Sequence, residues 1–145
     1  MFQAADVMTT TVVPVSPETT MKEAASLLLR HRVSGVPVVD DSGQIVGVIS
    51  EFDLLKLAYS PEMEFDRVGD HMSTKLLTVT PDEPLIEIVD IFMSHPIRRL
   101  PVISEGKLVG LISRHDLIRF VLVARDRVST AQRERLSAVT TSGGK

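Results

Sequence analysis

Two copies of a Ser-x-x-Asp pattern are the strongest candidates for chemistry in this sequence. Ser50 precedes Asp53 by three residues, Ser113 precedes Asp116 in the same way, and each serine ends a short apolar run. A serine followed three residues later by an acidic residue is an ordinary way to cap the start of a helix. Alternatively, the hydroxyl and the carboxylate face a cleft, because a carboxylate can accept hydrogen bonds from both hydroxyls of a ribose. The pattern alone leaves both interpretations open.

Two adjacent arginines are the second candidate. Arg98 and Arg99 stand immediately before the apolar segment 100–103. A guanidinium group presents its N–H donors as a fork that matches phosphate oxygens, so the pair could bind a phosphate group. The alternative is an ordinary pair of solvated surface charges. Arg114 and His115 lie inside the second Ser-x-x-Asp pattern and are further candidates of the same kind.

Other chemistry has little support in the sequence. There is no cysteine, and the four histidines show none of the spacings typical of metal sites. The glycine-rich nucleotide-binding loops and the Gly-x-Ser-x-Gly nucleophile motif are absent. An enzyme would need a positioned base or nucleophile in a cleft, for which His115 is only a modest candidate. We therefore expect no catalytic residue, no metal, no cofactor and no enzymatic activity.

Composition narrows the class of protein. The 145 residues are 43% hydrophobic and 4% aromatic, lack tryptophan and carry a formal net charge of −3. That charge offers no bulk attraction for nucleic acid or anionic lipid, and the basic stretch 125–135 is balanced by acidic residues. The N-terminus lacks a signal-peptide pattern, and no apolar run reaches the roughly 20 residues that span a bilayer. We expect a cytoplasmic protein that binds neither nucleic acid nor membrane.

These candidate residues lie within an internal repeat. After a shift of about 64 positions the sequence matches itself in one order, with one small gap. Residues 6–9 (DVMT) match 70–73 (DHMS), and residues 45–50 (IVGVIS) match 108–113 (LVGLIS). The chain is therefore predicted to contain two copies of one unit of roughly sixty residues.

The sequence pattern of each unit predicts the element order βαββα. Apolar residues at helical spacing run through 21–28 and 85–92, which indicates one buried helix face in each unit. Ser16 and Thr80 are each followed by proline, which predicts that they cap the starts of these helices.

Two strands and a second helix complete each unit. In the first unit, apolar strands are predicted at 36–39 and 45–49, joined by the turn 40–43 (DDSG). The second helix is expected to begin at Ser50, or at Ser113 in the second unit.

The repeat also predicts how the chain is organised. We expect a first repeat at 1–60, a linker at 61–69, a second repeat at 70–124 and a charged C-terminal helix or tail at 125–145. A single unit is too small to bury both faces of its sheet. The expected fold is α/β (α+β), with two units packed as one domain with facing small sheets and pseudo-two-fold symmetry.

With these motifs in place, residues 4–124 resemble a cystathionine β-synthase (CBS) domain pair, or Bateman module. The resemblance rests on Asp-x-Met-Thr/Ser at the start of each unit, the Pro-Val strand after the helix, and Gly-x-Ile-Ser-x-x-Asp at the start of the last helix. It implies two clefts between facing sheets, a homodimer, and binding of AMP, ADP, ATP, S-adenosylmethionine or a related adenosine ligand.

The resemblance also assigns roles to residues. Ser50 with Asp53, and Ser113 with Asp116, would each hold a ribose. Arg98 and Arg99 would bind phosphate in the Asp53 cleft, and Arg114 and His115 would lie beside the Asp116 cleft, which has only Ser34 and Gly35 opposite. The residues expected to flank the adenine of the Asp53 cleft are Thr10, Thr11, Val12, Val36, Pro37 and Val38.

The function implied by the resemblance is a regulatory module, such as an energy sensor, that acts on an unidentified effector protein. The alternative is a structural or dimerisation module without a physiological ligand.

Overall fold

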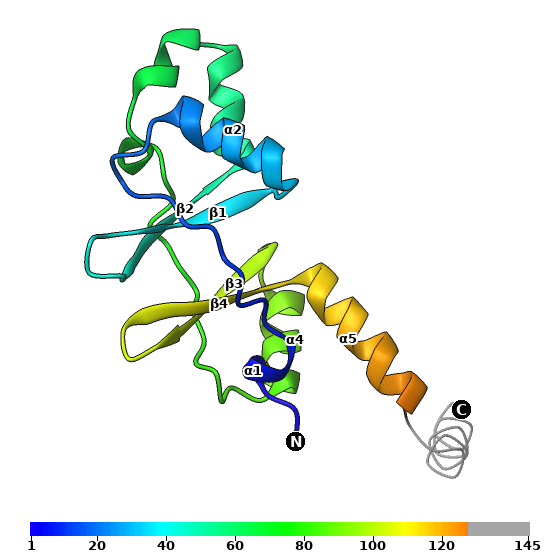
Figure 1. Cartoon of the computed structure of the whole chain (residues 1–145). Coiled ribbons are helices and arrows are strands. Elements are labelled where there is room, and N and C mark those ends of the chain that lie inside the picture. Colours follow the sequence, from blue (N-terminus) through cyan, green and yellow to red (C-terminus); the bar gives the residue numbers. More distant parts are fainter. Residues whose placement is uncertain (128–145) are drawn as a thin grey trace.

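The computed structural model describes residues 1–127, which form two similar halves (Figure 1). The first half contains α2 (Met21–His31), β1 (Gly35–Val39), β2 (Ile45–Ser50), α3 (Glu51–Leu54) and the 3₁₀ turns η1 (Leu55–Ala58), η2 (Pro61–Phe65) and η3 (Val68–Asp70). The second half contains α4 (Leu85–Ser94), β3 (Arg99–Ser104), β4 (Lys107–Ser113) and α5 (Arg114–Arg127), and the short α1 (Ala4–Val7) lies near the N-terminus. The predicted pair of mixed α/β repeats is confirmed.

Each half is built on one antiparallel hairpin. β1 pairs with β2 from Gly35–Ser50 to Val39–Ile45, and β3 pairs with β4 from Arg99–Ser113 to Ser104–Lys107. The hairpins meet in the middle of the molecule, with α2 and α4 on their far sides (Figure 1). The Lys107 ammonium group of one turn donates to the Ser42 carbonyl of the other at 3.0 Å. The predicted strands and facing hairpins are therefore confirmed.

Local chemistry explains the first turn. The Asp40 carboxylate accepts hydrogen bonds from the Ser42 N–H at 2.9 Å, the Ser42 hydroxyl at 2.6 Å and the Gln44 N–H at 3.0 Å. These bonds hold the pKa of Asp40 below its ordinary value. Gly43 adopts φ +87°, a left-handed conformation that glycine adopts without steric cost.

The first strand of each predicted βαββα unit is reduced to a single bridge. Val15 pairs in parallel with Val38 of β1, and Val79 pairs in the same way with Val102 of β3. The shortness of these contacts explains why each sheet has only two full strands.

The two halves also exchange segments at their outer sheet edges. Thr9, from the start of the chain, bridges Leu111 of β4, whereas Ser73, from the start of the second repeat, bridges Val48 of β2. Each sequence repeat therefore contributes its opening segment to the sheet of the other repeat.

The core consists of two separate clusters, one in each half. The first contains Val15, Met21, Ala24, Leu28, Val36, Val38, Ile49 and Val68, and the second contains Ala4, Val79, Ile88, Leu100, Val102, Ile112 and Leu117. Both predicted helical stripes contribute buried residues to these clusters. Because each hairpin packs against its own helix, the region between the halves is left for polar contacts and a cavity.

The predicted starts of the first helices are wrong by about one turn. α2 begins after Thr20, whose hydroxyl accepts from the Glu23 N–H at 3.1 Å, rather than after Ser16. The carbonyls of Pro17 and Thr19 accept instead from the N–H groups of η3, at 2.9 Å and 2.7 Å. These tertiary hydrogen bonds take the place of the first helical turn.

The second half departs from the prediction in the same way. α4 begins after Pro84, and the Thr80 hydroxyl donates to Asp82 at 2.5 Å instead of capping the start of the helix. The carbonyls of Pro81 and Glu83 accept from the N–H groups of Ala5 and Ala4, both at 2.9 Å.

The second helices differ between the halves. α5 continues for 14 residues, whereas α3 has a single turn of four residues before the 3₁₀ turn η1. Pro61 follows shortly afterwards and disfavours helical geometry at the preceding residue, so the chain turns into η2. The tail predicted at 125–145 lies mostly outside the described residues. Within the described residues, no helix is long and apolar enough to cross a membrane.

Candidate ligand-binding cleft

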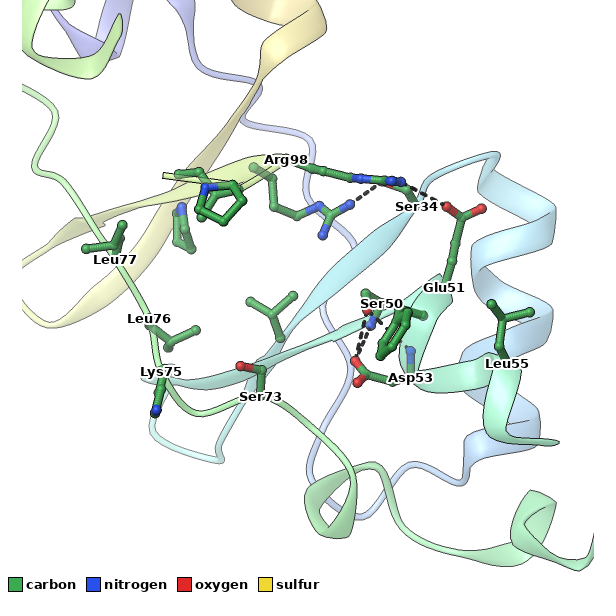
Figure 2. A pocket seen from close by; sticks show the side chains of 16 residues that line it. Ser34, Ser50, Glu51, Asp53, Leu55, Ser73, Lys75, Leu76, Leu77 and Arg98 are labelled. Atoms are coloured by element: carbon green, nitrogen blue, oxygen red, sulfur yellow. Dashed lines mark hydrogen bonds and ion pairs between the residues drawn. The ribbon is translucent and has the colours of Figure 1, made fainter. Parts of the chain in front are cut away.

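A cavity of about 740 Å³ lies between the two halves (Figure 2). It brings together four of the predicted site residues, Ser50 and Asp53 from the first repeat with Arg98 and Arg99 from the second. The remaining lining residues are Ser34, Val48, Glu51, Phe52, Leu55, Ser73, Lys75, Leu76, Leu77, Pro96, Ile97 and Pro101. Figure 2 shows Ser50 and Asp53 across the cavity from Lys75 and Leu76.

Ser50 and Asp53 form the helix cap that their spacing predicts. The Ser50 N–H donates to Asp53 Oδ2 at 2.9 Å, the Ser50 hydroxyl donates to the same oxygen at 3.0 Å, and the Asp53 N–H donates to Ser50 Oγ at 3.4 Å. Asp53 Oδ1 makes no hydrogen bond or ion pair within residues 1–127. The capping interpretation is therefore confirmed, and the cap also leaves one carboxylate oxygen available in the cleft.

The two arginines differ in their surroundings. Arg98 Nη1 lies 3.7 Å from Glu51 Oε1, and both side chains are exposed. Arg99 is partly buried, and its Nη2 donates to the Ser34 hydroxyl. Burial and the positive charge of Arg98 lower the pKa of Arg99, while Glu51 raises it, but an arginine stays protonated at neutral pH.

Within the described part of the chain, Arg99 has no carboxylate partner. It is therefore a partly desolvated cation at the cavity wall. An anion reaching this wall would find a donor fork held against Ser34.

In the second Ser-x-x-Asp site, nearby groups of the chain itself contact the Asp116 carboxylate. The Ser113 N–H donates to Asp116 Oδ2 at 2.9 Å, and the Thr9 hydroxyl lies 3.4 Å from both carboxylate oxygens. Arg119 Nη1 lies 3.8 Å from Asp116 Oδ1, and the Asp116 side chain is only 13% exposed. Asp116 therefore has contacts on both carboxylate oxygens, whereas Asp53 keeps one oxygen free of hydrogen bonds within the described residues.

Comparison with known proteins identifies the family. The model of the CBS domain family matches residues 4–60 and again residues 68–123. The chain belongs to the CBS domain family. Because the match occurs twice, the chain contains a CBS domain pair.

Several proteins resemble this CBS pair over most of its length. The CBS domain-containing protein YhcV of Bacillus subtilis is 36% identical over 118 residues, which cover 81% of this chain and 84% of that protein. The structure of CBSX2 in complex with AMP, a protein of Arabidopsis thaliana, has a TM-score of 0.79 and 31% identity, covering 86% of this chain and 99% of that one. An inosine-5'-monophosphate dehydrogenase of Aquifex aeolicus is 34% identical over 109 residues, covering 74% of this chain but only 22% of the enzyme.

The residues predicted to flank adenine are not part of this cleft. Val36, Pro37 and Val38 are buried within β1, and Val38 belongs to the first core cluster. Thr10, Thr11 and Val12 do not line the cavity; they follow Thr9, which pairs with the sheet of the second half. The exchange of opening segments accounts for the position of Thr10, Thr11 and Val12. The β1 residues are away from the cleft for another reason, because Val36 and Val38 pack in the core of their own half.

The segment that does line the cleft is the repeat counterpart of the predicted one. Lys75 and Leu76 match Thr11 and Val12 under the shift of the repeat. The repeat could have pointed to these residues, but nothing in one repeat tells which sheet its opening segment joins.

Ser34 and Glu51 are further cleft residues that sequence reasoning did not assign to this site. Ser34 was expected opposite the Asp116 cleft, but it lines the Asp53 cavity and contacts Arg99. Arg114 and His115 are exposed and do not line this cavity. No group of three or more possible metal-ligating side chains occurs among the described residues.

Proposed function

We propose that this CBS pair is a regulatory module that binds an adenosine-containing ligand in the cleft between its repeats. The observation that carries the proposal is that one cavity joins a carboxylate from the first repeat with two arginines from the second. Its volume of about 740 Å³ lies within the range typical of small-molecule sites. A related structure, CBSX2 at 31% identity, is a complex with AMP, which supports the same ligand class here.

The geometry supports a role for each residue. The available oxygen of Asp53 would accept hydrogen bonds from the ribose hydroxyls, with Ser50 holding the carboxylate in place. Arg99, and to a smaller extent the exposed Arg98, would bind phosphate oxygens. Leu76 is an apolar neighbour for the base. AMP, ADP, ATP and S-adenosylmethionine all share the adenosine part of this scheme.

Regulation would follow from the position of the cleft. The halves have separate cores, and polar contacts such as Ser42–Lys107 and Ser34–Arg99 join them. A ligand that bridges the halves would favour one of their arrangements by its difference in affinity for each. An effector protein that recognises this arrangement would then sense the ligand. If AMP and ATP compete for the cleft, the module would respond to the energy state of the cell. A cytoplasmic location fits the lack of cysteine, because the cytoplasm is reducing.

A homodimer is the second part of the proposal. The repeat pairs Leu29 with Met93 and Leu55 with Ile118, and these four side chains are 80%, 82%, 64% and 61% exposed, respectively. Leu29 and Leu55 line one surface pocket. That apolar patch, and the exposed apolar residues at the equivalent positions of the second repeat, suit a second copy that covers both by the same packing.

The alternative function is a structural module without a ligand. The observation that favours it is the cap itself, because the Ser50–Asp53 hydrogen bonds explain both residues without any ligand. A dimer formed through the apolar patches would then be its whole activity.

The two functions are separated by calorimetric titration of the purified protein, freed of carried-over nucleotide. AMP, ADP, ATP, S-adenosylmethionine and NAD would be tested in turn, with guanosine monophosphate as the control. Saturable binding of an adenosine ligand at one site per chain is the expected result. No binding of any of them by a folded protein would favour the structural module.

A further inference from the structure

We infer that Glu51 is a built-in counter-anion that competes with ligand phosphate for the cleft arginines. This inference rests on the proposed function and adds a determinant of specificity to it. Glu51 would lower the affinity for phosphate-bearing ligands while leaving adenosine binding unchanged. It therefore sets how strongly the cleft prefers a charged ligand over an uncharged one.

The backbone fixes Glu51 at the junction of the two repeats. Glu51 is the first residue of α3, and its N–H donates to the Ser34 carbonyl at 2.9 Å. Its carboxylate reaches across to Arg98 of the other repeat, with 3.7 Å between Oε1 and Nη1. Figure 2 shows Glu51, Ser34 and Arg98 together at one end of the cavity.

Helix capping alone does not require an acid at this position. Acidic residues are favourable in the first turn of a helix, but Asp53 already supplies one there. The repeat counterpart of Glu51 is Arg114, which begins α5 with the opposite charge. Glu51 of the first repeat instead faces Arg98 of the second repeat. The first repeat has no such arginine pair, because Ser34 and Gly35 stand at the positions that match Arg98 and Arg99.

The Glu51–Arg98 pair is suited to displacement by a ligand. Arg98 and Glu51 are 65% and 60% exposed, and an exposed ion pair of this kind is weak. A phosphate group offers several charged oxygens to the same guanidinium and also reaches the partly buried Arg99. Binding of phosphate would therefore release Glu51 and break one of the contacts between the halves.

The test is the Glu51→Gln variant, which keeps the size of the side chain and removes its charge. Adenosine, AMP and ATP would be titrated into wild type and variant at low and at high salt. We expect AMP to bind about two- to five-fold more tightly to the variant, as removal of an exposed ion pair predicts, and ATP at least as much. Adenosine affinity should stay the same, and the gain should shrink at high salt.

Glu18→Gln is the matched control. Glu18 forms an exposed ion pair with Arg67 at 3.9 Å, and neither residue lines the cavity. It changes the net charge by the same amount, so we expect no change in any affinity. Thermal unfolding of both variants would confirm that they are folded.

The outcomes distinguish this inference from the proposed function. If wild type binds AMP and Glu51→Gln does not raise the ratio of AMP to adenosine affinity, the role of Glu51 is wrong and the nucleotide site stands. An equal gain in Glu18→Gln would also overturn it, because net charge would be the cause. If neither wild type nor variant binds any of the three ligands, this inference is wrong; if ADP and S-adenosylmethionine also fail to bind, the proposed function is wrong as well.

Discussion

Replacement of Arg99 by glutamine tests the phosphate part of the account. The substitution removes a partly buried positive charge from the cavity wall but leaves a polar side chain opposite Ser34. In wild type this guanidinium has no ion pair with a carboxylate within residues 1–127, although the charge of Glu51 acts on it, so a ligand phosphate would be its first directly paired anion.

The expected magnitude follows from these contacts. A hydrogen bond to a charged group contributes about 1.5–3 kcal/mol, so Arg99→Gln should weaken AMP binding about 10- to 150-fold. Adenosine carries no phosphate and should bind with unchanged affinity. The free energy of unfolding should change by less than about 1 kcal/mol, because the lost bond to Ser34 is offset by the relief of desolvation and of repulsion from Arg98.

Calorimetry with AMP and adenosine, together with urea unfolding, measures all three quantities. Arg98→Gln is the comparison variant and should weaken AMP binding less, because its side chain is 65% exposed and already paired with Glu51. If Arg99→Gln weakens AMP and adenosine equally, Arg99 does not bind phosphate and the assignment is refuted.

Three further predictions concern the scaffold. Gly47→Ala should lower the free energy of unfolding by about 1–3 kcal/mol in urea, since the added Cβ would lie 2.9 Å from the backbone carbonyl oxygen of Ser73 as well as 2.5 Å from Met72 Sδ. An unchanged midpoint would contradict the packing of this exchanged segment on β2. Asp40→Asn should destabilise the protein at pH 7, because the folded state lowers the pKa of Asp40 and so gains stability above the pKa of about 3.9 of the unfolded chain. The difference in stability from wild type should vanish as the pH falls through the lower pKa of the folded state. A difference that stays constant with pH would refute this reasoning. Leu29→Lys should shift the protein from dimer to monomer in sedimentation, whereas Phe65→Lys, at an exposed apolar residue elsewhere, should not; a dimer in both variants would contradict the proposed interface.

Most of what could be predicted about the fold from the sequence came from the internal repeat. Local patterns placed the hairpins correctly, because turn residues such as Asp40 and Gly43 and the apolar strands act over a few positions. The helix starts were misplaced because the N–H groups of Val68 and Gly69 bind carbonyls that a helix beginning after Ser16 would otherwise use. Such distant partners leave no local signal.

The sequence was enough to predict the polar residues of the candidate site but not the other residues that line the cavity. Asp53 and Arg99 were identifiable by side-chain chemistry, and the structure brings both to one cavity. The predicted wall residues came from the first opening segment, because Thr11 and its counterpart Lys75 occupy the same position in two repeats with the same pattern. The pairing of Ser73 with β2 brings the second segment to this cleft, where Lys75 and Leu76 line the cavity.

AMP titration of Asp53→Asn and Asp116→Asn in parallel tests the central claim most directly. Both substitutions remove a carboxylate charge at the third position of a helix after a capping serine, so they are matched in local structure. The account predicts that Asp53→Asn weakens AMP binding about tenfold or more, while Asp116→Asn binds as wild type does. Wild-type affinity in Asp53→Asn, or an equal loss in both variants, would contradict a ribose site at Asp53.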